Sequence, residues 1–490
     1  MKLKFKPMHL EAGRPIAFIN GKFAKKLNII EGSRIEISHK GTKLILSVNI
    51  IKKLLSEKEI SLSEEAISNF KIKKGEKIEI SVALEPRSTR FILKKVNNLE
   101  LSKKEIHVII EDIVNNALNE AEIAYFVTGV YHNGMSVKEI IYLTEAMAHT
   151  GQILKWKEKK IADKHSIGGI PGNRTTPLVV AICAAAGITI PKTSSRAITT
   201  AAATADVMEA VTNISLSVYD LQKVVRKTNA CLAWGGSLGL APADDKLIRV
   251  EKMLNLDPEP QLIASILSKK IATGSKFILL DVPYGKGAKV SFAQAKKLKQ
   301  HFLKISNHFK LNLKVVLTPG FQPIGNAVGP VLEMIDVYKI LKRKHGRPLD
   351  LEKKSILLAS HLLEMTKKAK KGKGKEMAEK ILDSGRALKK FEEIISAQGK
   401  KKKTLKLAKF KHNILGKHSG KVKSTDNKLI NHLARILGCP TDKAAGLYLY
   451  KHVNDKIKKG EKLLTLYSES KKKLNAGIKF YRQTRPIILS

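Results

Sequence analysis

Two segments near the start of the chain share one pattern of apolar and charged positions. Residues 27–37 (LNIIEGSRIEI) recur as residues 70–80 (FKIKKGEKIEI), so that Phe70 stands 43 positions after Leu27. Each copy predicts a turn centred on a glycine, followed by a strand in which isoleucines alternate with charged residues. We therefore expect a small pseudo-symmetric β-barrel. Because it carries no reactive cluster, we assign it to scaffolding or assembly.

Helical signals follow the repeat. Ser102 with Glu105, and Ser136 with Glu139, have the spacing of a capping box at a helix start. Gly151 is a suitable end for the second of these helices. The first carries an apolar face with helical spacing, formed by Ile106, Ile109, Ile110, Ile113 and Val114.

Short strand patterns alternate with helical patterns from Lys159 to about Lys400. Residues 277–282 (FILLDV) and 313–317 (LKVVL) are examples of the strands, and their alternation with helices predicts an α/β sheet. Nearer the C-terminus, residues 453–463 predict a hairpin with its turn at Gly460.

These patterns predict a multidomain α/β protein. We expect a helical domain and a mixed α/β sheet domain, with a small barrel-like domain before them and an α+β domain after them. The expected boundaries are 1–84 for the N-terminal β-rich domain with the repeat, 97–160 for the helical domain (joined by part of 245–275), 161–400 for the α/β domain and 410–490 for the C-terminal α+β domain.

The net charge of the chain adds little to these predictions. Ninety Lys and Arg residues against 44 Asp and Glu leave a net charge of +46 over 490 residues, which favours anionic ligands. The lysines run from Lys2 to Lys479 and are dense only in residues 367–375 and 400–403. Aromatic residues make up 5%, too few for an evident base-stacking surface. Nucleic-acid binding as the main role is therefore not favoured.

Targeting and metal signals are weak in this sequence. The longest apolar stretch, residues 178–190, is too short to span a bilayer and contains Gly187. No secretory leader is visible in the first residues. The cysteines, Cys183, Cys231 and Cys439, are far apart and have no metal-ligand spacing. We expect a cytoplasmic, reduced protein with no membrane span and no bound metal.

A glycine-rich turn is the first candidate for chemistry. Residues 163–176 (DKHSIGGIPGNRTT) place three glycines just before an apolar helix pattern. Glycines let the backbone approach a ligand closely, and amides at a helix start attract anions. Lys164 and Ser166 add a charge and a hydroxyl. The segment predicts an anion site, although a plain turn explains the glycines equally well.

A hydroxyl-rich segment supports the anion site. Residues 193–204 (TSSRAITTAAAT) contain six hydroxyl side chains and Arg196 within twelve positions. Helix capping explains one or two of these hydroxyls but not six.

A third stretch begins at Asp257. Asp257 before Pro258 is typical of a helix N-cap, and Gly274 is a suitable end for that helix. Ser265 and Lys269 are four apart and so share one helix face. The same pattern occurs in ordinary surface helices.

Together these stretches resemble the thymidine and pyrimidine-nucleoside phosphorylase family. The resemblance rests on residues 164–169 (KHSIGG), 194–204, 264–270 (ASILSKK) and 285–289 (GKGAK). Residues 170–173 (IPGN) and 234–245 (WGGSLGLAPADD) are similar to one subgroup, the AMP phosphorylases and related bacterial proteins labelled as thymidine phosphorylases.

The resemblance implies phosphorolysis of an N-glycosidic bond, with inorganic phosphate as co-substrate and no further cofactor. It also implies a helical domain that faces the α/β domain across a closing cleft, and a homo-oligomer, a dimer or larger. The substrate is expected to be a nucleoside 5′-monophosphate such as AMP, or a nucleoside. Two alternatives are a basic nucleic-acid-binding protein on an enzyme-derived fold and a phosphoribosyltransferase of the same fold type.

Residue roles are likewise implied by the resemblance, position by position. For phosphate binding, the matching positions are Lys164, Ser166, Ser194 and Thr204. For nucleotide contacts they are Gly169, Ser195, Arg196, Ala197, Ile198, Thr199, Thr200, Thr204, Ser265 and Lys289. Asp257 matches the proton donor, and His165, Ser265 and Lys269 match base contacts, so Asp257, His165 and Lys269 form the expected catalytic group.

Two positions carry a question of chemistry. An N-cap carboxylate accepts backbone N–H bonds, which favours its ionised form and opposes a role as an acid, so Asp257 is either a proton donor or only a cap. Ala203 stands where relatives usually have glycine. Its methyl group is expected to narrow the path by which phosphate reaches Thr204.

Overall fold

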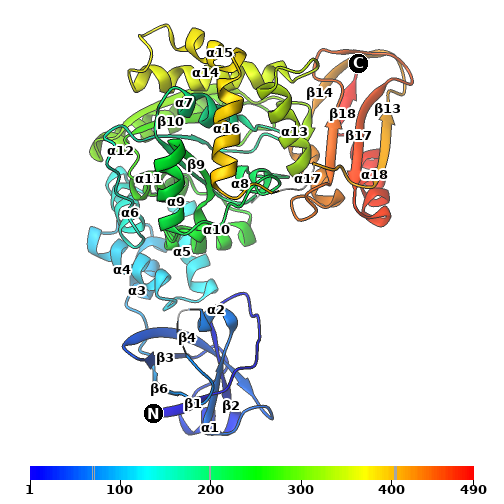
Figure 1. The fold of residues 1–490 in the computed structure, drawn as a ribbon. Helices are drawn as coiled ribbons and strands as arrows, with labels where there is room; N and C mark the ends of the chain where they lie inside the picture. The colour runs from blue at the N-terminus through cyan, green and yellow to red at the C-terminus, as the bar shows by residue number, and fades with distance from the viewer. Residues whose placement is uncertain (69, 71, 198–199, 402–404) are drawn as a thin grey trace. The chain divides into compact units, whose positions relative to one another are not determined.

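The protein is described from a computed structural model that covers residues 1–490 apart from residues 69, 71, 198–199 and 402–404. The chain divides into two compact units. One contains residues 1–150 and 242–265, and the other contains residues 151–241 and 266–490. Figure 1 gives the order of the elements along the chain.

The first strands close into a barrel in the order β1-β5-β2-β4-β3-β6 (Figure 1). Ile37 of β3 pairs directly with Ile80 of β6 across an antiparallel ladder, and these are equivalent positions of the sequence repeat. The repeat also relates Asn20, the N-cap of α1, to Ser63, the N-cap of α2. The elements are β1 (Lys2–Phe5), β2 (Ile16–Asn20), α1 (Gly21–Lys26), β3 (Arg34–His39), β4 (Thr42–Ile51), β5 (Glu59–Leu62), α2 (Glu64–Ile67) and β6 (Lys77–Val82).

Helices make up the rest of the first unit. Both predicted capping boxes are present, at Ser102 and at Ser136, and the second helix ends at His149, two residues before the expected glycine. Ile106, Ile109, Ile110 and Ile113 are buried, as the apolar spacing predicts. The helices are α3 (Ser88–Val96), α4 (Lys103–Val114), α5 (Glu120–Asn133), α6 (Val137–His149), α10 (Pro242–Leu254) and the start of α11 (Glu259–Ala272).

Parallel strands form the centre of the second unit. Strand β10 lies between β7 and β11, and β8 pairs with β9, all in parallel. A parallel bridge from Ile161 to Thr189 connects the segments that lead into β7 and β8. The carboxyl ends of these strands therefore lie at one edge. The strands are β7 (Ala162–Ser166), β8 (Ile190–Ser194), β9 (Ala230–Trp234), β10 (Phe277–Tyr284) and β11 (Asn312–Pro319).

Helices cover this sheet and enclose the largest core. Helix α7 (Thr175–Ala185) is apolar all round, and residues 175–184 are buried, as expected for a central helix. Among the described helices, none is both long and apolar enough to cross a bilayer. The other elements are α8 (Thr204–Met208), α9 (Val218–Thr228), η1 (Gly235–Ser237), α12 (Phe292–His308), α13 (Pro330–Leu341), α14 (Leu349–Met365), α15 (Gly374–Asp383) and α16 (Arg386–Ala397).

The C-terminal elements correct one prediction. The turn at Gly460 exists, with φ +78°, but the strands on its two sides do not form a hairpin. Strand β16 pairs with β14, whereas β17 lies between β13 and β15. Tertiary partners outcompete the local pairing because β16 is only two residues long. The elements are β12 (Ala327–Val328), β13 (Phe410–Leu415), β14 (Gly420–Thr425), α17 (Asn427–Leu437), β15 (Gly446–Leu449), β16 (Lys456–Ile457), β17 (Lys462–Ser468), α18 (Lys471–Thr484) and β18 (Ile487–Leu489).

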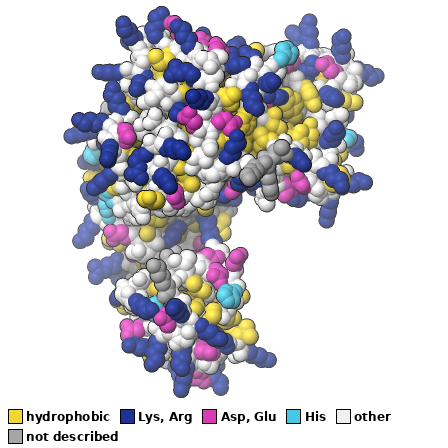
Figure 2. Space-filling model, in the orientation of Figure 1, with side chains coloured by type: hydrophobic (Ala, Val, Ile, Leu, Met, Phe, Trp, Pro, Cys, Tyr) yellow, Lys and Arg dark blue, Asp and Glu magenta, His cyan; other side chains and the backbone are white. Residues whose placement is uncertain are grey.

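Charged side chains are dispersed over the surface. On the face that Figure 2 displays, lysines and arginines are spread over many elements and are interspersed with acidic side chains. This distribution resembles a solvated surface more than a single binding stripe.

Candidate active site

The three stretches on which the predicted anion site rests lie where parallel strands end. The glycine turn follows β7, the hydroxyl-rich segment follows β8, and residues 285–289 follow β10. The carboxyl edge of a parallel sheet is the usual place for ligands in α/β proteins. Three stretches that are far apart in sequence thus follow the carboxyl ends of parallel strands in two sheets, β11-β10-β7 and β8-β9, that one parallel bridge joins.

Direct contacts join these stretches. Asn431 of α17 donates from Nδ2 to the Gly169 carbonyl (3.3 Å) and accepts at Oδ1 from the Ala201 amide (3.0 Å). A Cβ atom built on Gly169 lies 3.1 Å from the Lys289 Cγ, and the glycine has φ +92°, so only glycine suits this close approach. The amides of Gly168 and Gly169 have no hydrogen-bond partner within the described part of the chain.

Arg174 makes a second link between the glycine turn and the hydroxyl-rich segment. Its guanidinium donates to the Thr204 Oγ1 (3.2 Å) and to the Ala202 carbonyl (2.9 Å), and its Nε donates to Glu333 (2.7 Å). Burial raises the pKa of Glu333, which the charge of Arg174 opposes. The start of α8 at Thr204 is therefore held against the start of α7.

One face of β7 carries Lys164 and Ser166. Lys164 is 1% exposed, and its Nζ donates to the Thr175 Oγ1 (2.8 Å) and to the Thr176 Oγ1 (3.4 Å) at the start of α7. Burial lowers the pKa of Lys164 to about 7, although the charge of Asp281 opposes this shift. Such an ammonium gains from an incoming anion, which raises its pKa again.

Asp281 of β10 is the register partner of Ser166 and shares this face. Its carboxylate accepts hydrogen bonds from the Ser166 Oγ (2.9 Å) and the Thr318 Oγ1 (2.6 Å). The Lys354 Nζ lies 3.0 Å from the same Oδ2 that Ser166 contacts. Burial alone would raise the pKa of Asp281, but Lys354 and Lys164 lower it, so the group is an anion.

The opposite face of β7 carries Asp163 and His165, because side chains alternate along a strand. Asp163 is fully buried between the Lys270 Nζ (2.6 Å) and the Lys192 Nζ (3.4 Å). Burial lowers the pKa of Lys270 to about 7, against the attraction of Asp163. His165 is half-buried, and desolvation followed by the charges of Lys270 and Lys192 holds its pKa well below the usual value. His165 is therefore a neutral hydrogen-bonding group at pH 7.

The buried charges around β7 do not balance. The lysines of this cluster are Lys164, Lys192, Lys270 and Lys354, and its carboxylates are Asp163 and Asp281. On the face of Lys164 and Ser166, Lys164 and Lys354 stand against the carboxylate of Asp281. On the opposite face, Lys192 and Lys270 stand against Asp163. When its lysines are protonated, each face therefore has one more positive than negative charge. A buried surplus of positive charge is costly on its own, and an anion bound beside Lys164 would offset it.

Arg196 has several partners within the second unit. It forms two hydrogen bonds to Glu209 (2.9 and 2.8 Å), and its guanidinium lies 4.9 Å from the Trp234 ring centroid. Asp206 accepts from the amides of Ala197 (2.8 Å) and Ala203 (2.9 Å). These contacts fold the hydroxyl-rich segment back onto α8. The Arg196 guanidinium thus already has protein partners in the absence of a ligand.

The remaining predicted positions in this segment vary in exposure. Ser194 is half-buried and Ser195 is exposed, and Thr200 donates to the Ala202 carbonyl (3.0 Å). Ile198 and Thr199 lie outside the described residues. Ala203 has φ −106°, a conformation open to any residue, so its backbone does not require glycine.

The third stretch is divided between the two units. Asp257 is exposed just before α11 and belongs to the first unit. Ser265 belongs to the first unit and Lys269 to the second, and both are half-buried on the same helix. The predicted four-residue spacing thus falls on a helix, as expected.

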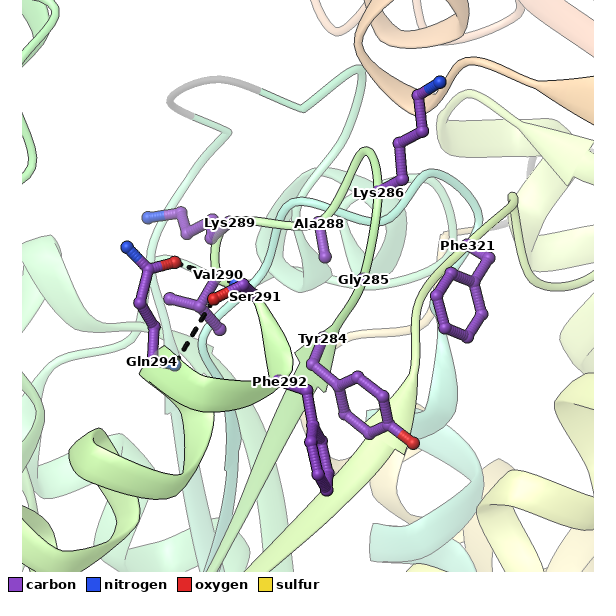
Figure 3. A pocket seen from close by; sticks show the side chains of 10 residues that line it. All are labelled: Tyr284, Gly285, Lys286, Ala288, Lys289, Val290, Ser291, Phe292, Gln294 and Phe321. Atoms are coloured by element: carbon purple, nitrogen blue, oxygen red, sulfur yellow. Dashed lines mark hydrogen bonds between the residues drawn. The ribbon is translucent and has the colours of Figure 1, made fainter.

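A pocket of about 450 Å³ lies beside the turn after β10 (Figure 3). The ring centroid of Tyr284 is 4.8 Å from that of Phe292 and 6.0 Å from that of Phe321. A Cβ atom on Gly285 would come within about 2.4 Å of the Phe321 ring. The aromatic ring therefore packs on the turn that carries Lys289.

Several residues of this site were not among those that the sequence predicted. Lys192 and Asp281 are charged residues inside strands, a signal that was available in the sequence. Lys354 and Asn431 come from helices far along the chain, and no local pattern marks them. No group of three or more His, Cys, Asp or Glu residues suited to a metal ion occurs among the residues that the structure describes.

Family models match three segments of the chain. A glycosyl transferase family helical bundle domain matches residues 89–151, and the a/b domain of that family matches residues 158–388. A pyrimidine nucleoside phosphorylase C-terminal domain matches residues 421–487.

Curated relatives are similar over nearly the whole chain. The AMP phosphorylase of Methanococcus aeolicus is 40% identical, and that of Pyrococcus abyssi is 44% identical. Each alignment covers 99% of this chain and 97% of the relative. Among solved structures, anthranilate phosphoribosyltransferase from Thermus thermophilus has a TM-score of 0.52 at 16% identity and covers 63% of this chain and 98% of its own. That likeness concerns the fold alone.

Proposed function

Because this chain belongs to the thymidine and pyrimidine-nucleoside phosphorylase family, in the subgroup of the AMP phosphorylases, we propose that it is a phosphorolytic pentosyltransferase. Inorganic phosphate attacks C1′ of a nucleoside 5′-monophosphate or nucleoside. The free base leaves and a sugar 1-phosphate forms, which is ribose 1,5-bisphosphate if the substrate is AMP. The relatives' names favour AMP over thymidine.

One observation carries the proposal. The buried surplus of positive charge around Lys164 lies at the strand edge where the glycine turn and the hydroxyl-rich segment meet. An anionic nucleophile such as phosphate offsets this positive charge, and fixed donors in a buried site stabilise it without reorganisation. The site thus supports holding phosphate in line for attack.

The leaving base requires a second set of groups. As the bond breaks, negative charge develops on the base and needs a cation or an acid. We propose Lys269 and neutral His165 as groups that meet this charge, and Asp257 as the proton donor. For Asp257, Ser265 and the nucleotide-contact positions, the proposal rests on the family resemblance. We further propose that the protein is cytoplasmic, acts as a homo-oligomer, and needs no cofactor besides phosphate as co-substrate.

The test is release of free base. The protein is incubated with phosphate and, separately, with AMP, CMP, thymidine and adenosine, and base is quantified by chromatography. We expect phosphate-dependent release that is fastest with AMP. Lys164→Met should abolish it, whereas Lys304→Met, at an exposed position on α12, should leave it unchanged. The proposal fails if no substrate yields base.

The alternatives give different results in the same assay. A phosphoribosyltransferase would require pyrophosphate chemistry with an activated phosphoribosyl donor and Mg²⁺. A nucleic-acid-binding protein would show salt-sensitive affinity for DNA or RNA and no base release. The names of the relatives favour neither the phosphoribosyltransferase nor the nucleic-acid-binding protein.

A further inference from the structure

Ser166 has its hydroxyl proton committed before any ligand binds. Its Oγ lies 2.9 Å from the Asp281 Oδ2. A carboxylate can only accept hydrogen bonds, so the serine is the donor in this pair. The Asn173 Nδ2 also donates to the Ser166 Oγ, at 3.4 Å. Towards a ligand, the serine oxygen therefore offers a lone pair rather than a proton.

Asp281 is held in this arrangement from several sides. The side chain is fully buried, and Thr318 donates to its other oxygen at 2.6 Å. The Lys354 Nζ, 3.0 Å from Oδ2, keeps the carboxylate ionised. If Ser166 turned its proton towards a ligand, the buried Asp281 Oδ2 would lose one hydrogen-bond donor, which is unfavourable.

We propose that the Ser166–Asp281 pair makes the anion site selective for an oxyanion that carries a proton. Hydrogen phosphate, HPO₄²⁻, has one P–OH group that donates to the Ser166 Oγ, while its other oxygens accept from Lys164 and the backbone amides. Sulfate has the same charge and a similar size but no proton. Its oxygen would face the serine lone pair, with the Asp281 charge directly behind it.

This inference rests on the proposed function and deepens it. A site with donors alone would bind the two dianions about equally. An acceptor in the site discriminates by leaving the wrong ligand with an unsatisfied or repulsive contact. Ser166 and Asp281 are thus assigned to specificity, Ser166 as a group that contacts the anion and Asp281 as a positioning residue that acts through it.

The experiment compares the two anions on the whole protein. Phosphate and sulfate are titrated by calorimetry at a mildly alkaline pH, where phosphate is mainly the dianion, and at constant ionic strength. We expect the wild-type protein to bind phosphate at least about tenfold tighter than sulfate. In Ser166→Ala, phosphate should weaken and sulfate should not, which brings the ratio to within about threefold.

Two further variants test whether a change in the ratio of phosphate to sulfate affinity comes from the Ser166 proton or from a general loss of structure. The double variant Asp281→Asn with Lys354→Met removes both buried charges and avoids an unpaired ammonium. It frees the serine proton, so sulfate should gain relative to phosphate. Lys304→Met, at an exposed position on α12, is the control and should leave the ratio at the wild-type value.

The outcomes distinguish this inference from the function on which it rests. If phosphate drives base release but sulfate binds equally well, or if Ser166→Ala keeps the wild-type ratio, the selectivity inference is wrong and the function stands. If neither anion binds and no base is released, the phosphate site itself is wrong.

Discussion

The side-chain amide of Asn431 donates a hydrogen bond to the carbonyl of Gly169, at 3.3 Å. Its oxygen accepts from the Ala201 amide, so a residue of the C-terminal elements holds together the two loops of the proposed anion site.

Replacing Asn431 tests this bridge. Asn431→Ala should lower kcat/KM for phosphate by about tenfold, because loosely held loops lose the orientation of the nucleophile. Asn431→Asp keeps the acceptor for the Ala201 amide but loses the donor to Gly169. Its kcat/KM for phosphate should therefore lie between the values of the wild type and of Asn431→Ala. The exposed neighbour on the same helix, His432→Ala, is the matched control. Equal phosphate kinetics for Asn431→Ala and His432→Ala would show that the bridge has no functional role.

The lowered pKa values of Lys164 and Lys270, both about 7, predict proton uptake when an anion binds. Below pH 7 the ammonium forms are already present. Above pH 7 each lysine must take up a proton, so affinity falls by up to about tenfold per pH unit for each lysine.

Sulfate is the right probe for this dependence because its own charge is constant over the range. Titrations from about pH 6 to about pH 9 in buffers of different ionisation enthalpy should show weaker binding and more proton uptake at higher pH. A flat profile without proton uptake would mean that neither lysine senses the anion.

Asp163 should be important for stability because it separates two buried ammonium groups. Asp163→Asn leaves Lys192 and Lys270 without their counter-charge, and we expect a loss of about 3–5 kcal/mol in the free energy of unfolding. Thermal and denaturant unfolding measure it. Glu379→Gln, which removes an exposed pair with Lys375 at 3.9 Å, should cost less than about 1 kcal/mol. Similar losses in the two variants would contradict the assigned role.

Asp257→Asn distinguishes a proton donor from a helix cap. Asparagine keeps a side chain that can cap α11 but cannot donate a carboxylic proton. We expect kcat on AMP to fall by about 10²–10⁴-fold while the melting temperature stays near that of the wild type. Normal turnover in this variant would leave Asp257 with the capping role alone.

Much of the local structure was predictable because its causes are local. The isoleucine alternation and the glycine turns predict β3 and β6, and the serine–glutamate spacings predict the starts of α4 and α6. The 43-residue repeat predicts a pseudo-symmetric barrel, and the structure pairs the equivalent residues Ile37 and Ile80 of the two copies. The Gly460 turn was also correct as a turn, but not the pairing of its strands, which depends on distant partners.

Residue types along the chain were enough to mark the candidate segments, with glycines next to Lys164 and Ser166 and hydroxyls around Arg196. The contacts that those groups make follow from the three-dimensional fold. It turned the Ser166 proton towards Asp281, engaged Arg196 with Glu209 and brought Asn431 to Gly169. A hydrogen bond or an ion pair depends on a distance of a few ångströms, and these partners are between 13 and 262 positions apart in the sequence. The packing of the chain, and not a local pattern, sets those distances.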